Sequence, residues 1–159
     1  MTPSTKRIPE GMEGIIPHLV CDPCAEAIEF YKKAFGAEEL SRMMIPGGDK
    51  IVHAAISIGD RPIFMADDFP EYCEGTQQSP KALGGTPVTL HQYVEDCDAA
   101  IKRAADAGAT VKMPAEDMFW GDRYGVVVDP FGHSWAFSTH QRDLTPEEMM
   151  EGANKMFTA

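Results

Sequence analysis

The sequence predicts an α+β fold built from two βαβββ modules. The first observation behind this prediction is an internal repeat, with copies that begin at Ile15 and at Val88. In each copy an apolar strand pattern passes through an aspartate into an amphipathic helix pattern that a glycine ends. The second observation is that short strand patterns separated by turn residues follow each helix. Each half therefore reads as strand, helix, strand, strand, strand.

The first module is expected over residues 14–70, after a polar, flexible N-terminal lead of residues 1–13. We expect Asp22 to cap the helix by accepting hydrogen bonds from free backbone N–H groups, with the following proline in the first helical position. Gly36 should end the helix in a left-handed conformation. The strands of this module are expected at residues 15–20, 39–44, 51–58 and 62–65.

The second module is expected over residues 87–140, after a linker of residues 71–86 that is rich in Gly, Ser, Gln and Thr. Asp96 should cap its helix and Gly108 should end it. The strands of this module are expected at residues 88–94, 110–113, 119–124, 126–128 and 134–138.

Residues 141–159 are predicted to hold a C-terminal helix. Thr145 is its expected N-cap, and a proline and two glutamates follow in the first turn. Apolar residues at helical spacing give the helix one apolar side. We expect this side to pack on the domain or on a partner subunit rather than to take part in chemistry.

Composition and charge exclude several classes of partner. The chain has 159 residues and a formal net charge of −11, which opposes binding to nucleic acid or to an anionic membrane. A cationic ligand is compatible with this charge, although surface carboxylates more often serve solubility. No uncharged apolar run approaches the roughly 20 residues that span a bilayer. The N-terminal segment lacks the apolar core of a signal peptide, so a cytoplasmic protein is expected.

Four cysteines include one C-x-x-C pair, Cys21 and Cys24. Such a pair can be a redox site or half of a zinc site. The favoured interpretation is structural, because small residues fit where the first strand gives way to the helix. A zinc site would also need Cys73 and Cys97 to converge, and these two have no motif of their own.

Several segments together resemble the vicinal-oxygen-chelate superfamily, which includes glyoxalases, bleomycin-resistance proteins and dioxygenases. The matching segments are residues 27–38, 53–60, 118–121 and 125–133, and they span most of residues 14–139. Within this superfamily the chain is similar to the PhnB-like branch. The resemblance implies a curved eight-stranded mixed sheet around a cup, with half of the sheet from each module.

The resemblance also implies where a metal would bind, with one ligand on each of four strands. These positions fall on Ile15, His53, Thr89 and Ala136 in this sequence. Only His53 is a good metal ligand, and a single imidazole with a threonine hydroxyl cannot hold a divalent ion tightly. We therefore expect no cofactor, with a divalent metal as the alternative if the ligand set is unusual.

Strand alternation indicates which side chains face the cup. His53, His91 and Tyr93 should face it and converge, whereas His18 should face the helix and be structural. The alternative for His53 and His91 is a structural role between layers. The two remaining histidines, His133 and His140, are expected to be solvated.

Three further residues complete the candidate site. Trp120 can stack on a planar or cationic ligand, or else close the core or a dimer interface. Arg123 can pair with a ligand carboxylate, or with a nearby acid of the chain. Met65 can line an adaptable pocket, or simply fill the core. The candidate ligand-binding residues are His53, His91, Tyr93, Trp120, Arg123 and Met65, and no catalytic residue is identified.

The function expected from these observations is metal-free binding of a small molecule, similar to the sequestration of a drug or metabolite by bleomycin-resistance proteins. A homodimer is expected, without nucleic acid or membrane as a partner. One alternative is a metal-dependent lyase, isomerase or dioxygenase with His53, His91 and an acid such as Glu116 as ligands. The other is a purely structural dimerisation module that buries Trp120 and the C-terminal helix between subunits.

Overall fold

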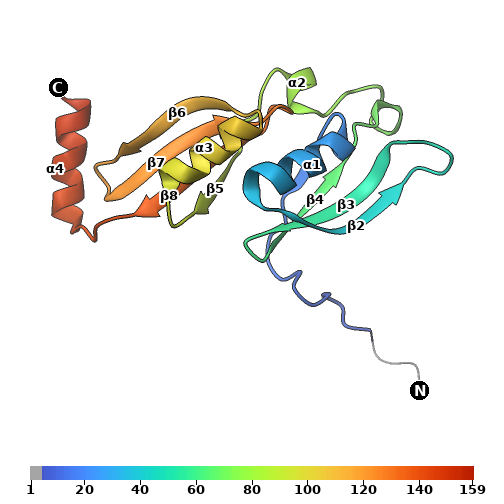
Figure 1. Cartoon of the computed structure of the whole chain (residues 1–159), viewed down its shortest axis with the longest axis horizontal. Helices are drawn as coiled ribbons and strands as arrows, with labels where there is room; N and C mark the ends of the chain where they lie inside the picture. The colour runs from blue at the N-terminus through green and yellow to red at the C-terminus, as the bar shows by residue number, and fades with distance from the viewer. Residues whose placement is uncertain (1–4) are drawn as a thin grey trace. The chain divides into compact units, whose positions relative to one another are not determined.

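The computed structural model describes residues 5–159, so the first four residues of the expected N-terminal lead lie outside the described residues. The chain divides into two compact units, unit 1 (Met1–Ala82) and unit 2 (Leu83–Ala159). Each unit contains one four-stranded mixed sheet with a helix on one of its faces (Figure 1). The predicted α+β class and the βαβββ order of each module are confirmed.

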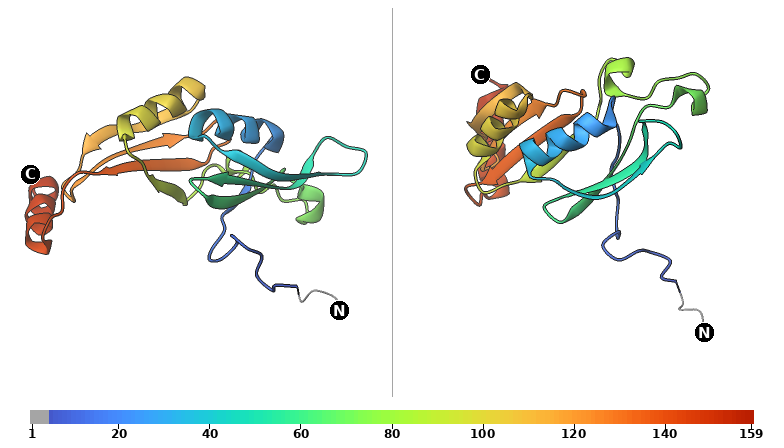
Figure 2. Two further views of the ribbon diagram at one scale, coloured as in Figure 1. Left: turned by 60° about the horizontal axis from the view of Figure 1, so that its bottom comes forward. Right: turned by 45° about the vertical axis from the view of Figure 1, so that its right-hand side comes forward.

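Unit 1 has the strand order β1-β4-β3-β2, in which β1 runs parallel to β4 and the other neighbours are antiparallel. This order places the first strand of the module beside the last. Figure 2 shows α1 on one face of this sheet, while no helix of the unit covers the other face. The elements are β1 (His18–Val20), α1 (Cys24–Phe35), β2 (Glu38–Met44), β3 (Ile51–Ile58) and β4 (Arg61–Ala66).

The core of unit 1 lies between α1 and the sheet. The helix buries the stripe expected from its 3.6-residue period, including Ile28 and Tyr31. From the sheet, Ile56 and Met65 are fully buried, and they occupy the strand positions that alternate toward the helix. Burying an aliphatic side chain of this size stabilises the fold by about 1.5–3 kcal/mol.

The N-terminus of α1 is capped by a residue that the sequence analysis did not identify. Asp22 was expected to cap the helix, and this prediction is wrong: the helix has no side-chain hydrogen bond from its own N-terminal segment. Instead the buried carboxylate of Asp67, just after β4, accepts hydrogen bonds from the backbone N–H of Cys24 at 2.9 Å and of Ile51 at 2.6 Å. Asp67 thereby joins the helix, β3 and β4. The predicted left-handed C-cap at Gly36 is confirmed, with a φ of 67°.

The segment predicted as a linker contains local structure of its own. It includes most of the 3₁₀ turn η1 (Pro70–Tyr72) and the short helix α2 (Pro80–Leu83). The buried carboxylate of Asp68 accepts hydrogen bonds from the backbone N–H groups of Gln78 and Ser79, at distances from 2.9 to 3.1 Å. These bonds tie residues 78–79 to the end of β4.

Unit 2 repeats the arrangement with the strand order β5-β8-β7-β6, in which β5 runs parallel to β8. Helix α3 contacts β6, β7 and β8, and buries Ile101 and Ala104. The predicted cap of this helix is confirmed, because the Asp96 carboxylate accepts from the Ala99 N–H at 3.0 Å. The elements are β5 (Thr89–Tyr93), α3 (Cys97–Ala107), β6 (Thr110–Asp117), β7 (Asp122–Val128), β8 (Ser134–His140) and α4 (Pro146–Phe157).

The strand predicted at residues 119–124 is wrong in its first half. Phe119 and Trp120 lie in the tight turn between β6 and β7, and β7 runs unbroken from Asp122. The turn is closed by a hydrogen bond from the Met118 N–H to the Asp122 carbonyl at 2.8 Å. Gly121 adopts a φ of 98° in this turn, a conformation that glycine adopts without steric penalty. Aromatic residues are typical of strands, so the sequence pattern indicated a strand where these two residues form a turn.

The C-terminal helix α4 begins with the expected cap. Thr145 and Glu148 form a capping box, in which each side chain accepts a hydrogen bond from the backbone N–H of the other residue. Gly152 brings the helix close to Phe119, because a Cβ at residue 152 would lie 2.8 Å from the Phe119 Cβ. No helix within residues 5–159 is both long and apolar enough to cross a bilayer.

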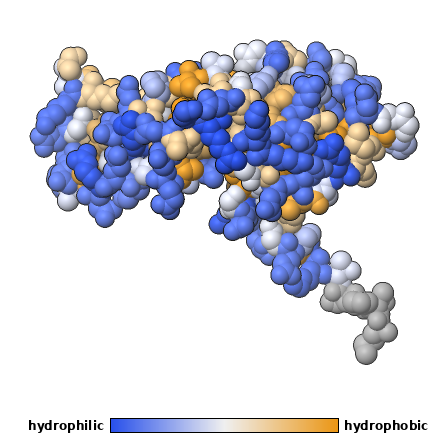
Figure 3. Space-filling view, viewed as in Figure 1, coloured by the Kyte–Doolittle hydropathy of each residue, from blue (hydrophilic) through white to orange (hydrophobic). Residues whose placement is uncertain are grey.

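Hydrophilic residues dominate the surface of each unit in the view of Figure 3, in which α1 and α3 lie in front of their sheets. This distribution agrees with the charged composition of the chain. The helix-covered faces of the two sheets are thus buried under helices whose outer sides are polar. The opposite face of each sheet carries the side chains that are free to contact a ligand.

Candidate functional site

The sheet of unit 2 presents one face to α3 and leaves the other without a helix. Phe137 of β8 pairs with Gly125 of β7, where a Cβ would lie 3.0 Å from Ile101 of α3, so Phe137 faces the helix and the alternating positions of β8 point the other way. The register pairs of β8 then define what lies beside them on β5 and β7. We call this surface the bare face of unit 2. Its residues include His91, Tyr93, Asp122, Tyr124, Ser134, Ala136, Ser138 and His140, with Trp120 at its edge.

A row of aromatic rings crosses the bare face of unit 2. The His91 ring lies 5.2 Å from the ring of Tyr93 and 5.8 Å from that of Tyr124, measured between centroids. The Tyr124 ring in turn lies 5.7 Å from the Trp120 ring, which meets Phe119 at 5.1 Å. Tyr93 is 62% exposed and His91 is also exposed, so these two rings are accessible to solvent.

A buried carboxylate fixes one end of this row. Asp122 is only 3% exposed, and its Oδ2 accepts a hydrogen bond from the Tyr93 hydroxyl at 2.7 Å. Its Oδ1 lies 2.7 Å from Nδ1 of His140, while Nε2 of the same imidazole lies 2.8 Å from Asp143. The network joins β5, β7 and β8 at the carboxyl ends of β5 and β8.

Hydrogen bonds within this network favour the charged forms of the Asp122 carboxylate and the His140 imidazole. Burial by itself raises the pKa of Asp122, but hydrogen bonds from His140, Tyr93 and Trp120 outweigh it and leave that pKa below its ordinary value. The carboxylates of Asp143 and then Asp122 raise the pKa of His140. The hydrogen bond to Asp122 also raises the pKa of Tyr93, so its hydroxyl stays protonated as a donor.

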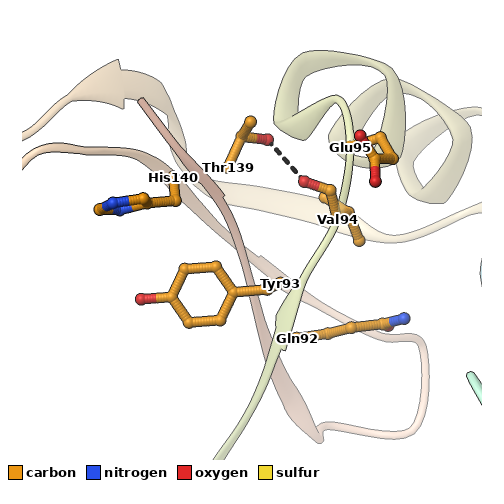
Figure 4. A pocket seen from close by; sticks show the side chains of 6 residues that line it. All are labelled: Gln92, Tyr93, Val94, Glu95, Thr139 and His140. Carbon is orange, nitrogen blue, oxygen red and sulfur yellow. Dashed lines mark hydrogen bonds between the residues drawn. The ribbon is translucent and has the colours of Figure 1, made fainter. Parts of the chain in front are cut away.

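A pocket of about 470 Å³ adjoins the network at the end of β5. In Figure 4 the side chains of Tyr93 and His140 point to the same side of the strands, and Thr139 Oγ1 donates to the Val94 carbonyl at 2.9 Å. The bare face thus continues into a concave edge. The pocket is lined by Gln92, Tyr93, Val94, Glu95, Thr139 and His140.

The sheet of unit 1 also has a face without a helix, and His53 lies on it. The His53 ring lies 4.7 Å from that of Phe64 and 6.0 Å from that of His18. His18 was expected on the helix side of β1, and this prediction is wrong, because Leu19 takes the buried helix-side position instead. Partial burial, and then the neighbouring His53, lower the pKa of His18.

The other two candidates lie on the helix side of their sheets. Met65 is fully buried in the core beneath α1. Arg123 donates from Nη2 to the Asp98 carboxylate at 2.9 Å and from Nη1 to Asp117 at 3.1 Å. These ion pairs raise the pKa of the Arg123 guanidinium. The structure thus matches the core alternative for Met65 and the ion-pair alternative for Arg123, and a ligand contact by either stays a prediction.

Of the sequence-predicted residues, the structure brings His91, Tyr93 and Trp120 together in unit 2, while His53 lies in unit 1. The residues that connect them, Tyr124 and Asp122, were not identified from sequence. Strand alternation through an unbroken β7 would have found both, but a strand drawn across the turn at residues 118–121 hid the pattern. His140 was expected to be solvated; it is exposed, and it also contacts two carboxylates.

The residues present do not fit the metal centre that the resemblance implies. Two of its four positions, Ile15 and Ala136, carry no donor atom, and Thr89 Oγ1 donates instead to Ser134 at 3.2 Å. The alternative metal-ligand set of His53, His91 and Glu116 also does not fit. His91 and Glu116 lie on opposite edge strands of the sheet, which are three strand spacings or about 14 Å apart. Within residues 5–159, no three His, Cys, Asp or Glu side chains form a metal-binding group.

The C-x-x-C pair has a structural environment. Cys21 and Cys24 are both fully buried and do not form a disulfide. Burial, followed by the nearby Asp67 carboxylate, raises the pKa of Cys24 to about 12. Because the thiolate is the reactive form, this thiol is poorly suited to redox or nucleophilic chemistry.

Comparison with known proteins assigns the chain to a family. The model of the Glyoxalase/Bleomycin resistance protein/Dioxygenase superfamily matches residues 15–137, and the chain belongs to this superfamily. The uncharacterized protein Mb0911c of Mycobacterium bovis is 50% identical over 133 residues, which cover 84% of this chain and 87% of that protein.

Solved structures show the same fold. TioX from Micromonospora sp. ML1 aligns with a TM-score of 0.61 and 26% identity, covering 80% of this chain and 99% of that chain. The PhnB protein of Bacillus cereus aligns with a TM-score of 0.59 and 18% identity, covering 80% of this chain and 99% of that chain. The resemblance found in the sequence is therefore confirmed.

Proposed function

We propose that the chain is a small-molecule-binding protein of this superfamily, which holds a planar organic compound on the bare face of unit 2 without a metal ion. The observation that carries the proposal is a row of adjacent rings on a sheet face that no helix of the unit covers, with His91 and Tyr93 exposed and Tyr124 and Trp120 half-buried. Adjacent exposed aromatic rings are unusual on a surface unless they contact something.

Ring stacking supplies the attraction in this proposal. Each aromatic pair contributes about 0.5–1.5 kcal/mol beyond its buried area, so contact with two or three rings gives a useful affinity. Sequestration requires only such binding, and the proposal includes no catalytic step.

A ligand screen with matched variants tests this proposal. The wild-type chain and two variants are screened against planar aromatic compounds by thermal shift, and hits are titrated by NMR. His91→Ala removes an exposed ring from the bare face, and hits should bind about five-fold more weakly, as expected for about 1 kcal/mol of lost stacking. Tyr72→Ala removes an exposed ring of unit 1 and should leave these affinities unchanged.

Two outcomes contradict the proposal. One is that no planar compound stabilises the wild-type chain. The other is that His91→Ala and Tyr72→Ala weaken binding equally, which would show that the bare face has no special role.

We also propose that the chain forms a homodimer in which a second copy covers the apolar side of α4. Its support is the exposure of Met150, Met156 and Phe157, the last of which is 74% exposed. Methionine and phenylalanine are enriched in protein interfaces. Light scattering should show a dimer for the full chain and a monomer after deletion of residues 144–159. A monomeric wild-type chain at micromolar concentration would contradict this proposal.

A further inference from the structure

The hydroxyl of Ser138 is the one buried side-chain oxygen or nitrogen without a hydrogen-bond partner in the described part of the chain. Ser138 is fully buried, at 0% exposure. Leaving a buried hydroxyl unpaired destabilises a fold, and buried polar groups in native proteins are nearly always satisfied. Such an exception calls for an explanation in terms of function.

Ser138 lies at the centre of the bare face of unit 2. Its register partner on β5 is Tyr93 and its register partner on β7 is Tyr124, so a tyrosine flanks it on each side. Residues paired across neighbouring strands point to the same face of the sheet. Phe137, the preceding residue, pairs with Gly125, whose side of the sheet faces Ile101 of α3, so Ser138 points away from the helix.

Three other polar side chains on this side of the sheet have partners within the chain. The Tyr93 hydroxyl donates to Asp122, His140 contacts two carboxylates, and Ser134 accepts from Thr89. Ser134 lies on the same strand and the same face as Ser138, four residues earlier. One serine of β8 is therefore satisfied by the fold and the other is not.

We infer that Ser138 is the polar anchor of the binding face, and that the ligand is a planar ring with a hydroxyl or carbonyl oxygen on its edge. This inference rests on the proposed function. The ligand ring enters between Tyr93 and Tyr124 and stacks on the aromatic row. The ligand oxygen then forms a hydrogen bond with the Ser138 hydroxyl. Tyr93 is mostly exposed, so its ring can move aside without opening the core, at the cost of its hydrogen bond to Asp122.

The geometry also gives selectivity. A ring without an oxygen would stack equally well but would leave Ser138 unpaired in the complex. A site with a buried polar group discriminates against an analogue that cannot pair with it. The bare face should thus prefer phenol to toluene, which have almost the same shape.

The test compares Ser138→Ala with the matched control Ser134→Ala. Phenol and toluene serve as probes, and dissociation constants come from NMR titration of the folded full-length chain. The wild-type chain should bind phenol about five-fold more tightly than toluene, as expected for one neutral hydrogen bond. Ser138→Ala should abolish this preference, whereas Ser134→Ala should retain it.

Thermal unfolding gives an independent readout without a ligand. Ser138→Ala removes an unsatisfied hydroxyl, so Tm should rise by about 2–4 °C. Ser134→Ala breaks an existing hydrogen bond and should leave Tm unchanged or lower it. A merely structural role for Ser138 would lower Tm in Ser138→Ala.

The outcomes separate this inference from the proposed function. Equal binding of phenol and toluene on the bare face, unaffected by Ser138→Ala, would overturn the inference and leave the proposed function standing. Failure of both probes to bind at millimolar concentration would overturn both. Loss of the phenol preference together with a raised Tm would support the inference.

Discussion

Removing the Asp67 carboxylate should destabilise unit 1 strongly, whereas removing the Asp22 carboxylate should not. Asp67 is buried and accepts one N–H from the first residue of α1 and one from the first residue of β3. Hydrogen bonds to a charged group contribute about 1.5–3 kcal/mol each, and truncation leaves buried donors unpaired. Asp67→Ala should therefore lower the free energy of unfolding by about 3–5 kcal/mol.

Asp22 is the matched control, since sequence pattern alone favours it as the cap. It is exposed and makes no capping hydrogen bond to α1, so Asp22→Ala should change the free energy of unfolding by less than about 0.5 kcal/mol. Urea unfolding followed by far-UV circular dichroism measures both variants. Circular dichroism is needed because both tryptophans, Trp120 and Trp135, lie in unit 2. A loss below about 1 kcal/mol for Asp67→Ala, or equal losses for the two variants, would refute the reasoning.

NMR titration should show His140 with a pKa above the ordinary histidine value and His18 with a pKa below it. The stabilisation from protonated His140 is fully present below the pKa that this residue has in the unfolded chain, and it is lost as pH rises through the folded pKa. The stabilisation from neutral His18 is present above the pKa that this residue has in the unfolded chain, and it is lost as pH falls through the folded pKa. The reverse order of the two pKa values would contradict the described networks. Gly121→Ala should lower stability by at least about 2 kcal/mol, because φ is 98° and the new Cβ would clash with the backbone carbonyl of Arg142. Gly84→Ala, with a φ of 83° but open space, isolates the backbone strain and should be the milder of the two in the same denaturation assay.

Local patterns predicted most of the fold. The helix periods, the glycine after α1, the Asp96 cap and the Thr145 cap all depend on residues within one turn of each other, and all four are confirmed. The alternation of β5 and β8 placed His91 and Tyr93 on the face away from α3. Such features follow from the sequence because the interacting groups are neighbours along the chain.

The missed features depend on residues that are distant in sequence. Asp67 caps a helix that begins 43 residues earlier, and no local pattern reports such a contact. The position of Ser138 between tyrosines of two other strands depends on strand register, which the sequence does not state. Asp122 was hidden for a different reason, because a strand drawn through Phe119 and Trp120 concealed the turn before it.

Chemical-shift mapping determines whether a planar ligand binds on the bare face of unit 2. The ¹⁵N-labelled full-length chain is titrated with the best compound of the screen, and shifted amides are assigned. We expect the largest shifts on β5, the start of β7 and the end of β8, around Tyr93, Tyr124 and Ser138. Shifts confined to the α3 side of the sheet, or to unit 1, would contradict this expectation.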